Sequence, residues 1–80
     1  MIAYNLYGKL FFDYDTAVQA GIAKMKKALS YGSPNVEYKT YRSKKNPKYI
    51  IIEQNLPLIN CIGVPYIDKK YYTIMETEIL

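Results

Sequence analysis

Residues 36–54 read VEYKTYRSKKNPKYIIIEQ and decide the fold, because they hold two runs of strand-forming residues around a lysine-rich turn that contains a proline. Such a pattern is typical of a β-hairpin. If the loop covers residues 43–47, Arg42 lies opposite Lys48 and Tyr41 lies opposite Tyr49. One side of this hairpin is then mainly apolar and carries Val36, Tyr38, Thr40, Ile50 and Ile52, and the other carries Glu37, Lys39, Tyr41, Tyr49, Ile51 and Glu53. A slip of one residue would mix the two sides, so burial favours this register.

Upstream, residues 2–12 alternate between apolar and polar side chains, which predicts one half-buried strand. Gly8 lies within it and indicates a bulge or the close approach of a neighbouring chain segment. The apolar side of this predicted strand holds Ile2, Tyr4, Leu6, Leu10 and Phe12.

The strongest local signal is an amphipathic helix over residues 13–32. Its apolar side chains recur every three or four residues, at Tyr14, Val18, Ile22, Met25 and Leu29. Asp13 or Asp15 can accept hydrogen bonds from the amides of the first turn, and Gly32 and Pro34 are placed to end the helix. A helix of this length can cover one face of a small sheet.

Further along the chain, residues 56–60 read as an apolar loop that packs at a sheet edge. Residues 61–67 and 71–77 predict a second hairpin, which turns at residues 68–70. The order is therefore one strand, one helix and four strands. We expect a single α+β domain covering all 80 residues, with one amphipathic helix packed on an antiparallel sheet of four or five strands.

The residue types present exclude several kinds of site. The chain has no histidine, and Cys61 is its one cysteine, so neither an internal disulfide nor a cysteine metal cage can form. Without a base to activate it, Cys61 is expected to be a buried structural thiol. Glu76 and Glu78 are expected to be edge or surface charges rather than metal ligands. We therefore expect no enzymatic activity, no cofactor and no metal.

The N-terminus lacks the basic segment and apolar run of a signal peptide, and the longest uncharged segment, residues 54–67, is short and interrupted by prolines and glycine. Together with the single unpaired cysteine, these features predict a cytoplasmic protein with no membrane partner. Isoleucine, tyrosine and lysine each occur ten times, which indicates an AT-rich genome and fits a bacterial virus or other mobile element.

Positive charge is concentrated in residues 24–48, where seven lysines and Arg42 are accompanied by a single acid, Glu37. Lysines set among tyrosines offer phosphate contacts and stacking platforms to a nucleic acid. The candidate binding residues are Lys39, Tyr41, Arg42, Lys44, Lys45, Lys48 and Tyr49, supported by Lys26 and Lys27. The competing interpretation is an ordinary solvated surface, on which the lysines keep the protein soluble.

Arg42 alone could supply the guanidinium fork that reads base edges. The sequence therefore favours a small non-enzymatic protein that contacts the nucleic-acid backbone with little sequence preference. The alternative is an inhibitor or adaptor from a mobile element, of the anti-CRISPR or anti-restriction kind, that binds a larger nucleic-acid-handling protein of the host. A third hypothesis is a homo-oligomer built through the last strand.

Overall fold

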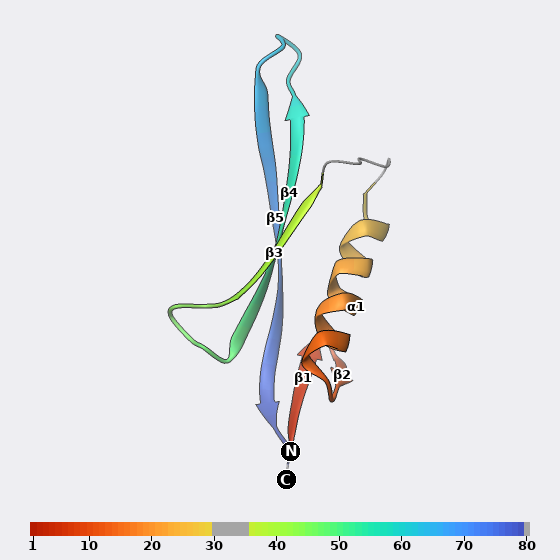
Figure 1. Cartoon of the computed structure of the whole chain (residues 1–80), viewed down its shortest axis with the longest axis vertical. Coiled ribbons are helices and arrows are strands. Elements are labelled where there is room, and N and C mark those ends of the chain that lie inside the picture. The colour runs from red at the N-terminus through yellow and green to blue at the C-terminus, as the bar shows by residue number, and fades with distance from the viewer. Residues whose placement is uncertain (30–35, 80) are drawn as a thin grey trace.

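The computed structural model describes residues 1–29 and 36–79, which form one helix and a five-stranded antiparallel sheet (Figure 1). In chain order the elements are β1 (Ile2–Leu6), β2 (Lys9–Phe11), α1 (Tyr14–Lys27), β3 (Glu37–Arg42), β4 (Tyr49–Ile59) and β5 (Pro65–Glu78). Across the sheet the strand order is β2-β1-β5-β4-β3. The predicted α+β class is confirmed, with one helix packed on an antiparallel sheet.

The segment predicted as one strand over residues 2–12 is instead a short hairpin of β1 and β2. Tyr7 and Gly8 have φ angles of 48° and 91°, as both central residues of a type I′ turn do. The turn is supported by a hydrogen bond of 2.8 Å from the Gly8 amide to Oδ1 of Asn5. Because the chain reverses here, the predicted core residues Leu10 and Phe12 are exposed.

The predicted helix is confirmed as α1, which begins after Asp13. Oδ2 of Asp13 accepts hydrogen bonds of 2.9 Å from the backbone amide and from the hydroxyl of Thr16. Both hydrogen bonds lower the pKa of Asp13, and the bond from the backbone amide has the larger effect. The last turn carries cations that complement the negative end of the helix dipole, Lys24, Lys26 and Lys27. α1 ends at Lys27 with Ala28 as its C-cap, which is earlier than the predicted end at Gly32; Gly32 and Pro34 lie outside the described residues.

A small core fills the space between α1 and one face of the sheet. Its buried side chains are Leu6, Ala17, Val18, Met25, Ile50, Ile52 and Ile74. Gly21 allows the helix to approach the sheet closely, because a Cβ at this position would lie 2.5 Å from Cδ1 of Ile52. Of the predicted helix stripe, Val18 and Met25 are buried and the other members are half-buried.

β3 and β4 form the predicted hairpin, but their register differs from the prediction by two residues. Tyr41 pairs with Ile51 rather than with Tyr49, and Arg42 pairs with Ile50. A shift by two keeps every side chain on its predicted side of the sheet, because side chains alternate with a period of two. The predicted sorting of side chains is therefore confirmed, whereas the predicted pairing of the two tyrosines is wrong.

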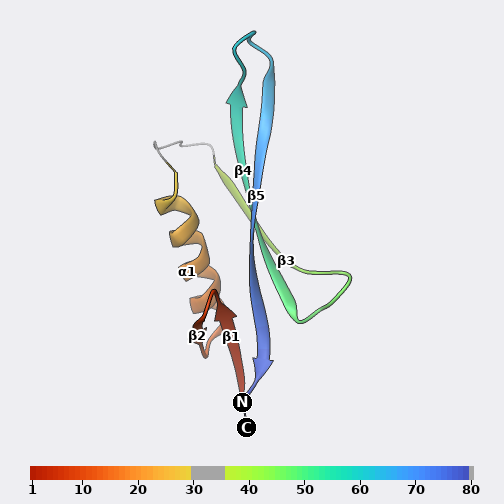
Figure 2. The same cartoon turned by 180° about the vertical axis from the view of Figure 1, so that it is seen from behind.

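β4 and β5 form one long hairpin that extends beyond the rest of the protein (Figures 1 and 2). The predicted loop at residues 56–60 and turn at residues 68–70 are wrong, because residues 56–59 and 68–70 lie within a continuous antiparallel ladder. The chain turns at residues 60–64 instead. The protein is consequently elongated, with extents of 55 × 26 × 17 Å. Its radius of gyration is 14.7 Å, against about 12 Å for a compact chain of this length.

Candidate functional site

α1 packs on one face of the sheet, and within the described residues no element covers the opposite face, which we call the open face. Strand alternation places on it the side chains of Tyr41, Tyr49, Ile51, Tyr71, Thr73 and Met75. Tyr41, Tyr49 and Tyr71 are 42%, 38% and 52% exposed. A shallow hollow of about 300 Å³ is lined by Ser43, Tyr49, Ile51 and Thr73. The open face therefore offers aromatic rings and a concave area to a ligand.

Three of the candidate lysines lie in the basic loop (residues 43–48), which borders the open face: Lys44, Lys45 and Lys48. All three are exposed. The loop is shaped in part by a hydrogen bond of 3.1 Å from the amide of Lys48 to Oδ1 of Asn46. A fourth candidate, Lys39, lies on the open face itself, where it pairs with Glu53. The basic loop joins β3, which carries Tyr41, to β4, which begins at Tyr49.

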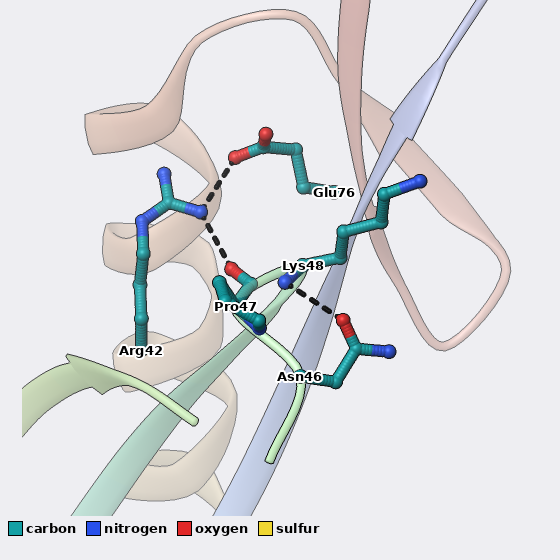
Figure 3. Close-up of polar contacts among 5 residues, drawn as sticks. All are labelled: Arg42, Asn46, Pro47, Lys48 and Glu76. Carbon is teal, nitrogen blue, oxygen red and sulfur yellow. Dashed lines mark hydrogen bonds and ion pairs between the residues drawn. The ribbon is translucent and has the colours of Figure 1, made fainter. Parts of the chain in front are cut away.

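Arg42 lies on the side of the sheet that faces α1, and its guanidinium is engaged within the protein (Figure 3). Its Nη1 lies 2.8 Å from Oε2 of Glu76 and donates a hydrogen bond of 2.8 Å to the carbonyl of Pro47. The hydrogen bond to Glu76 raises the pKa of Arg42. The side chain of Lys48 points away from this pair (Figure 3). The guanidinium fork is therefore not directed at the open face.

The candidate lysines of α1 also lie away from the open face. Nζ of Lys26 is 5.7 Å from the centre of the Tyr38 ring, whose hydroxyl donates a hydrogen bond of 3.0 Å to Gln54 on the helix side. Lys27 is exposed in the last turn. The structure thus divides the candidates into three groups. Those on the open face are Lys39, Tyr41 and Tyr49, those in the basic loop are Lys44, Lys45 and Lys48, and those on the helix side are Lys26, Lys27 and Arg42.

The centre of the open face holds a polar cluster that the sequence did not predict. Glu53 was expected to be exposed, yet Glu53 and Asn55 are each 8% exposed. Oε2 of Glu53 accepts a hydrogen bond of 2.8 Å from Nδ2 of Asn55, and Oε1 accepts a long one of 3.3 Å from the hydroxyl of Tyr41. The hydrogen bond from Asn55 lowers the pKa of Glu53. Burial acts in the opposite direction, and the positive charge of nearby Lys69 lowers the pKa further. The carboxylate is therefore ionised at neutral pH.

Two tyrosines adjoin this carboxylate from different strands. Tyr71 of β5 pairs with Glu53, and Tyr41 of β3 reaches it by its hydroxyl. The pKa of Tyr41 is raised, mainly by burial and to a smaller extent by the nearby Glu53 and Tyr71. Oδ1 of Asn55 is buried and has no hydrogen-bond partner among the described residues. Glu53, Gln54 and Asn55 form a run of three polar residues in β4, and this run does not indicate which of them are buried.

At the other end of the protein, residues 56–68 of the β4–β5 hairpin form a projection that we call the finger (Figure 1). Leu56 at its base is buried, but five of its large apolar side chains are between 47% and 79% exposed: Ile59, Ile62, Val64, Tyr66 and Ile67. The segment 54–67 carries no charge. Exposed apolar surface that is continuous over several residues usually marks an interaction site.

The tip of the finger is held in a defined shape. Oδ1 of Asn60 accepts hydrogen bonds from the amides of Ile62 at 3.1 Å and of Val64 at 2.9 Å. Gly63 has a φ of 83°, which favours glycine. Cys61 lies in this turn and is exposed. The prediction that Cys61 is a buried structural thiol is therefore wrong, because the hairpin turns at residues 60–64 and not at the predicted residues 68–70.

Comparison of the chain with protein-family models, with curated proteins and with solved structures found no match. Within residues 1–29 and 36–79, no group of three or more histidine, cysteine or acidic side chains is arranged to hold a metal ion. In the same part of the chain, no helix is long and apolar enough to cross a membrane. The open face and the finger are the features on which a function can be proposed.

Proposed function

We propose that the protein binds single-stranded nucleic acid on the open face, without catalysing a reaction. The observation that carries the proposal is the position of Tyr41 and Tyr49, which are partly exposed on an uncovered sheet face beside the lysines of the basic loop. Aromatic rings on a sheet stack with unpaired bases, and each stacked base contributes about 1–3 kcal/mol. Ammonium groups next to the rings attract the phosphates that link those bases.

The arrangement favours a single strand over a duplex, since bases in a duplex are stacked on one another and cannot stack on tyrosine. The engagement of Arg42 with Glu76 leaves the phosphate contacts to lysines, which act as point charges. Such contacts give an affinity that falls steeply with salt and depends little on sequence.

Fluorescence anisotropy with a labelled mixed-sequence strand of about 15 nucleotides, and with the matching duplex, tests this function. We expect tighter binding of the single strand. The triple variant Lys44→Glu, Lys45→Glu, Lys48→Glu should reduce the affinity at low salt. It should also decrease the salt slope by about two, because each phosphate that a lysine neutralises adds roughly 0.7 to the slope for a single strand.

A matched control places the same charge change elsewhere, with Lys9→Glu, Lys24→Glu and Lys70→Glu. Lys9 and Lys70 pair with residues of the helix-side face, and Nζ of Lys24 lies 5.0 Å from the centre of the Tyr7 ring. This variant should bind more tightly than the basic-loop variant. No binding of either nucleic acid at about 50 mM salt, or an equal decrease in affinity in the two triple variants, would refute the proposal.

The finger favours a second candidate function, that of an adaptor or inhibitor of a larger nucleic-acid-handling protein. Each of its faces is two strands wide and four residue pairs long, or about 10 × 13 Å, which is far below the area of a stable flat interface. The exposed side chains on both faces and at the tip are mainly apolar. A partner that surrounds the finger, such as a protein with an apolar cleft, would bury more of it. A virus-encoded inhibitor of a host enzyme fits this role.

Capture from extracts of the producing cell after nuclease treatment distinguishes the two functions. We expect a stoichiometric protein to be retained by the wild type and by the basic-loop variant, and to be absent with Ile59→Ser and Ile67→Ser. Release of the captured protein on nuclease treatment, or its equal retention by the finger variant, would rule out the finger as a protein-binding element.

A further inference from the structure

The centre of the open face presents hydrogen-bond acceptors that the protein itself does not fully use. The Glu53 carboxylate holds the donor group of Asn55 at 2.8 Å, which orients the amide and leaves Oδ1 of Asn55 without a partner among the described residues. The other carboxylate oxygen receives a long bond of 3.3 Å from Tyr41. An ionised carboxylate and an amide oxygen are both acceptors, so a ligand that satisfies them has to bring donors.

The position of the acceptors relates them to the proposed stacking surface. Tyr41 contacts the carboxylate by its hydroxyl, and Tyr71 pairs with Glu53 from the neighbouring strand. A base that stacks on either ring therefore has its edge near Glu53. Asn55 lies between Glu37 of β3 and Lys69 of β5, two exposed side chains that a base would displace to reach it.

We propose that the acceptor oxygens of Glu53 and Asn55 make the open face select bases that carry an amino group. Adenine and cytosine each present an exocyclic amino group on their pairing edge, and guanine presents an amino group beside a ring N–H. Thymine and uracil present one ring N–H between two carbonyl oxygens. Those carbonyl oxygens would face the acceptor oxygens of the protein, and two acceptors cannot form a hydrogen bond. The inference rests on the proposed nucleic-acid function and adds to it a base preference that lysine contacts with phosphates cannot supply.

The preference is measured with oligodeoxycytidylate, oligodeoxyadenylate and oligothymidylate of about 15 nucleotides, by anisotropy at neutral pH. The wild type should bind the first two at least about fivefold more tightly than the third, which is the lower end of the discrimination given by one good base contact. Glu53→Gln replaces an acceptor oxygen by a donor amide that can pair with a thymine carbonyl. The preference should then fall to about twofold or less.

Two further variants make the test specific. Glu37→Gln removes the same charge from an exposed position on the same face and should keep the wild-type preference. Tyr41→Phe keeps the ring but removes the hydroxyl that occupies Glu53, so its preference should equal or exceed that of the wild type. Circular dichroism melts show whether each variant is folded. If Glu53→Gln does not fold, Tyr41→Phe provides the test. Loss of the base preference in Tyr41→Phe would assign the selectivity to the tyrosine hydroxyl and overturn the inference.

The outcomes separate this inference from the function on which it rests. Equal affinity of the wild type for the three oligonucleotides, or a preference unchanged by Glu53→Gln, would overturn the base selection and leave single-strand binding in place. Absence of binding to all three at low salt would overturn the proposed function, and the base selection with it.

Discussion

Nη1 of Arg42 lies 2.8 Å from Oε2 of Glu76, so the one arginine of the chain forms an ion pair on the sheet face that α1 covers. The pair connects the end of β3 with β5 and, through the carbonyl of Pro47, with the basic loop. The sequence indicated that Arg42 contacts nucleic acid. Its geometry instead indicates a structural role for this side chain.

Arg42→Gln should have a small effect on both stability and binding. Because the Arg42 side chain is 46% exposed, solvent screens the pair with Glu76, and its contribution to the free energy of unfolding should be small. Urea unfolding of Arg42→Gln, of Glu76→Gln and of the double variant measures this coupling. The affinity of Arg42→Gln for a single strand should stay within about threefold of that of the wild type, because the substitution removes only one charge and that charge does not contact the strand. A much larger decrease would place Arg42 in the interface.

Gly21→Ala should destabilise the protein although alanine is the better helix former. The added Cβ would lie 2.5 Å from Cδ1 of the fully buried Ile52, and overpacking of this kind costs about 1–3 kcal/mol. The gain in helix propensity is about 1 kcal/mol and does not offset it fully. The double variant Gly21→Ala, Ile52→Val removes the methyl that clashes and should be more stable than Gly21→Ala alone. An increase in urea midpoint for the single variant would contradict this packing.

Substitutions in the finger should leave the stability nearly unchanged. Ile59 and Ile62 are 72% and 79% exposed, so replacing either by serine should change the free energy of unfolding by less than about 0.5 kcal/mol. Ile52→Ala, in the core, should lower it by about 2–5 kcal/mol. If the finger variants lose stability as Ile52→Ala does, the finger is packed against another part of the protein and is not a free binding element.

Glu53 should contribute to the pH dependence of stability. Its pKa in the folded state is lowered by the hydrogen bond from Asn55, so its ionised form stabilises the fold at pH values above the usual glutamate pKa. This contribution declines as the pH falls through the lowered folded-state pKa. The difference in unfolding free energy between the wild type and Glu53→Gln should therefore decrease toward acidic pH. A difference that grows on acidification would mean that the pKa of Glu53 is raised.

The sequence was sufficient for the features that depend on local periodicity. The apolar stripe of α1 was predicted and is confirmed, and of the two predicted caps, Asp13 and Asp15, Asp13 is the one observed. The sorting of side chains in β3 and β4 was also predicted, because parity survives a register error of two residues. Tyr41 and Tyr49 lie on the side of the sheet expected for them, and their role in binding stays a prediction.

The features that were missed depend on turns and on contacts between distant strands. Gly8 was interpreted as a bulge and not as part of a turn, because the turn also requires a positive φ at Tyr7, which tyrosine rarely adopts. Pro57 lies in the part of β4 beyond its pairing with β3, where proline does not interrupt a ladder. The burial of Glu53 arises from side chains on three strands, which no local pattern reveals.

Amide chemical-shift mapping by NMR shows whether the open face binds single-stranded nucleic acid. During titration with an unlabelled mixed-sequence strand of about 15 nucleotides, we expect the largest shifts at Tyr41, Tyr49, Thr73 and the basic loop. The amides of α1 and of the finger tip should change least. Absence of shifts at low salt, or shifts centred on the lysines of α1, would contradict the account.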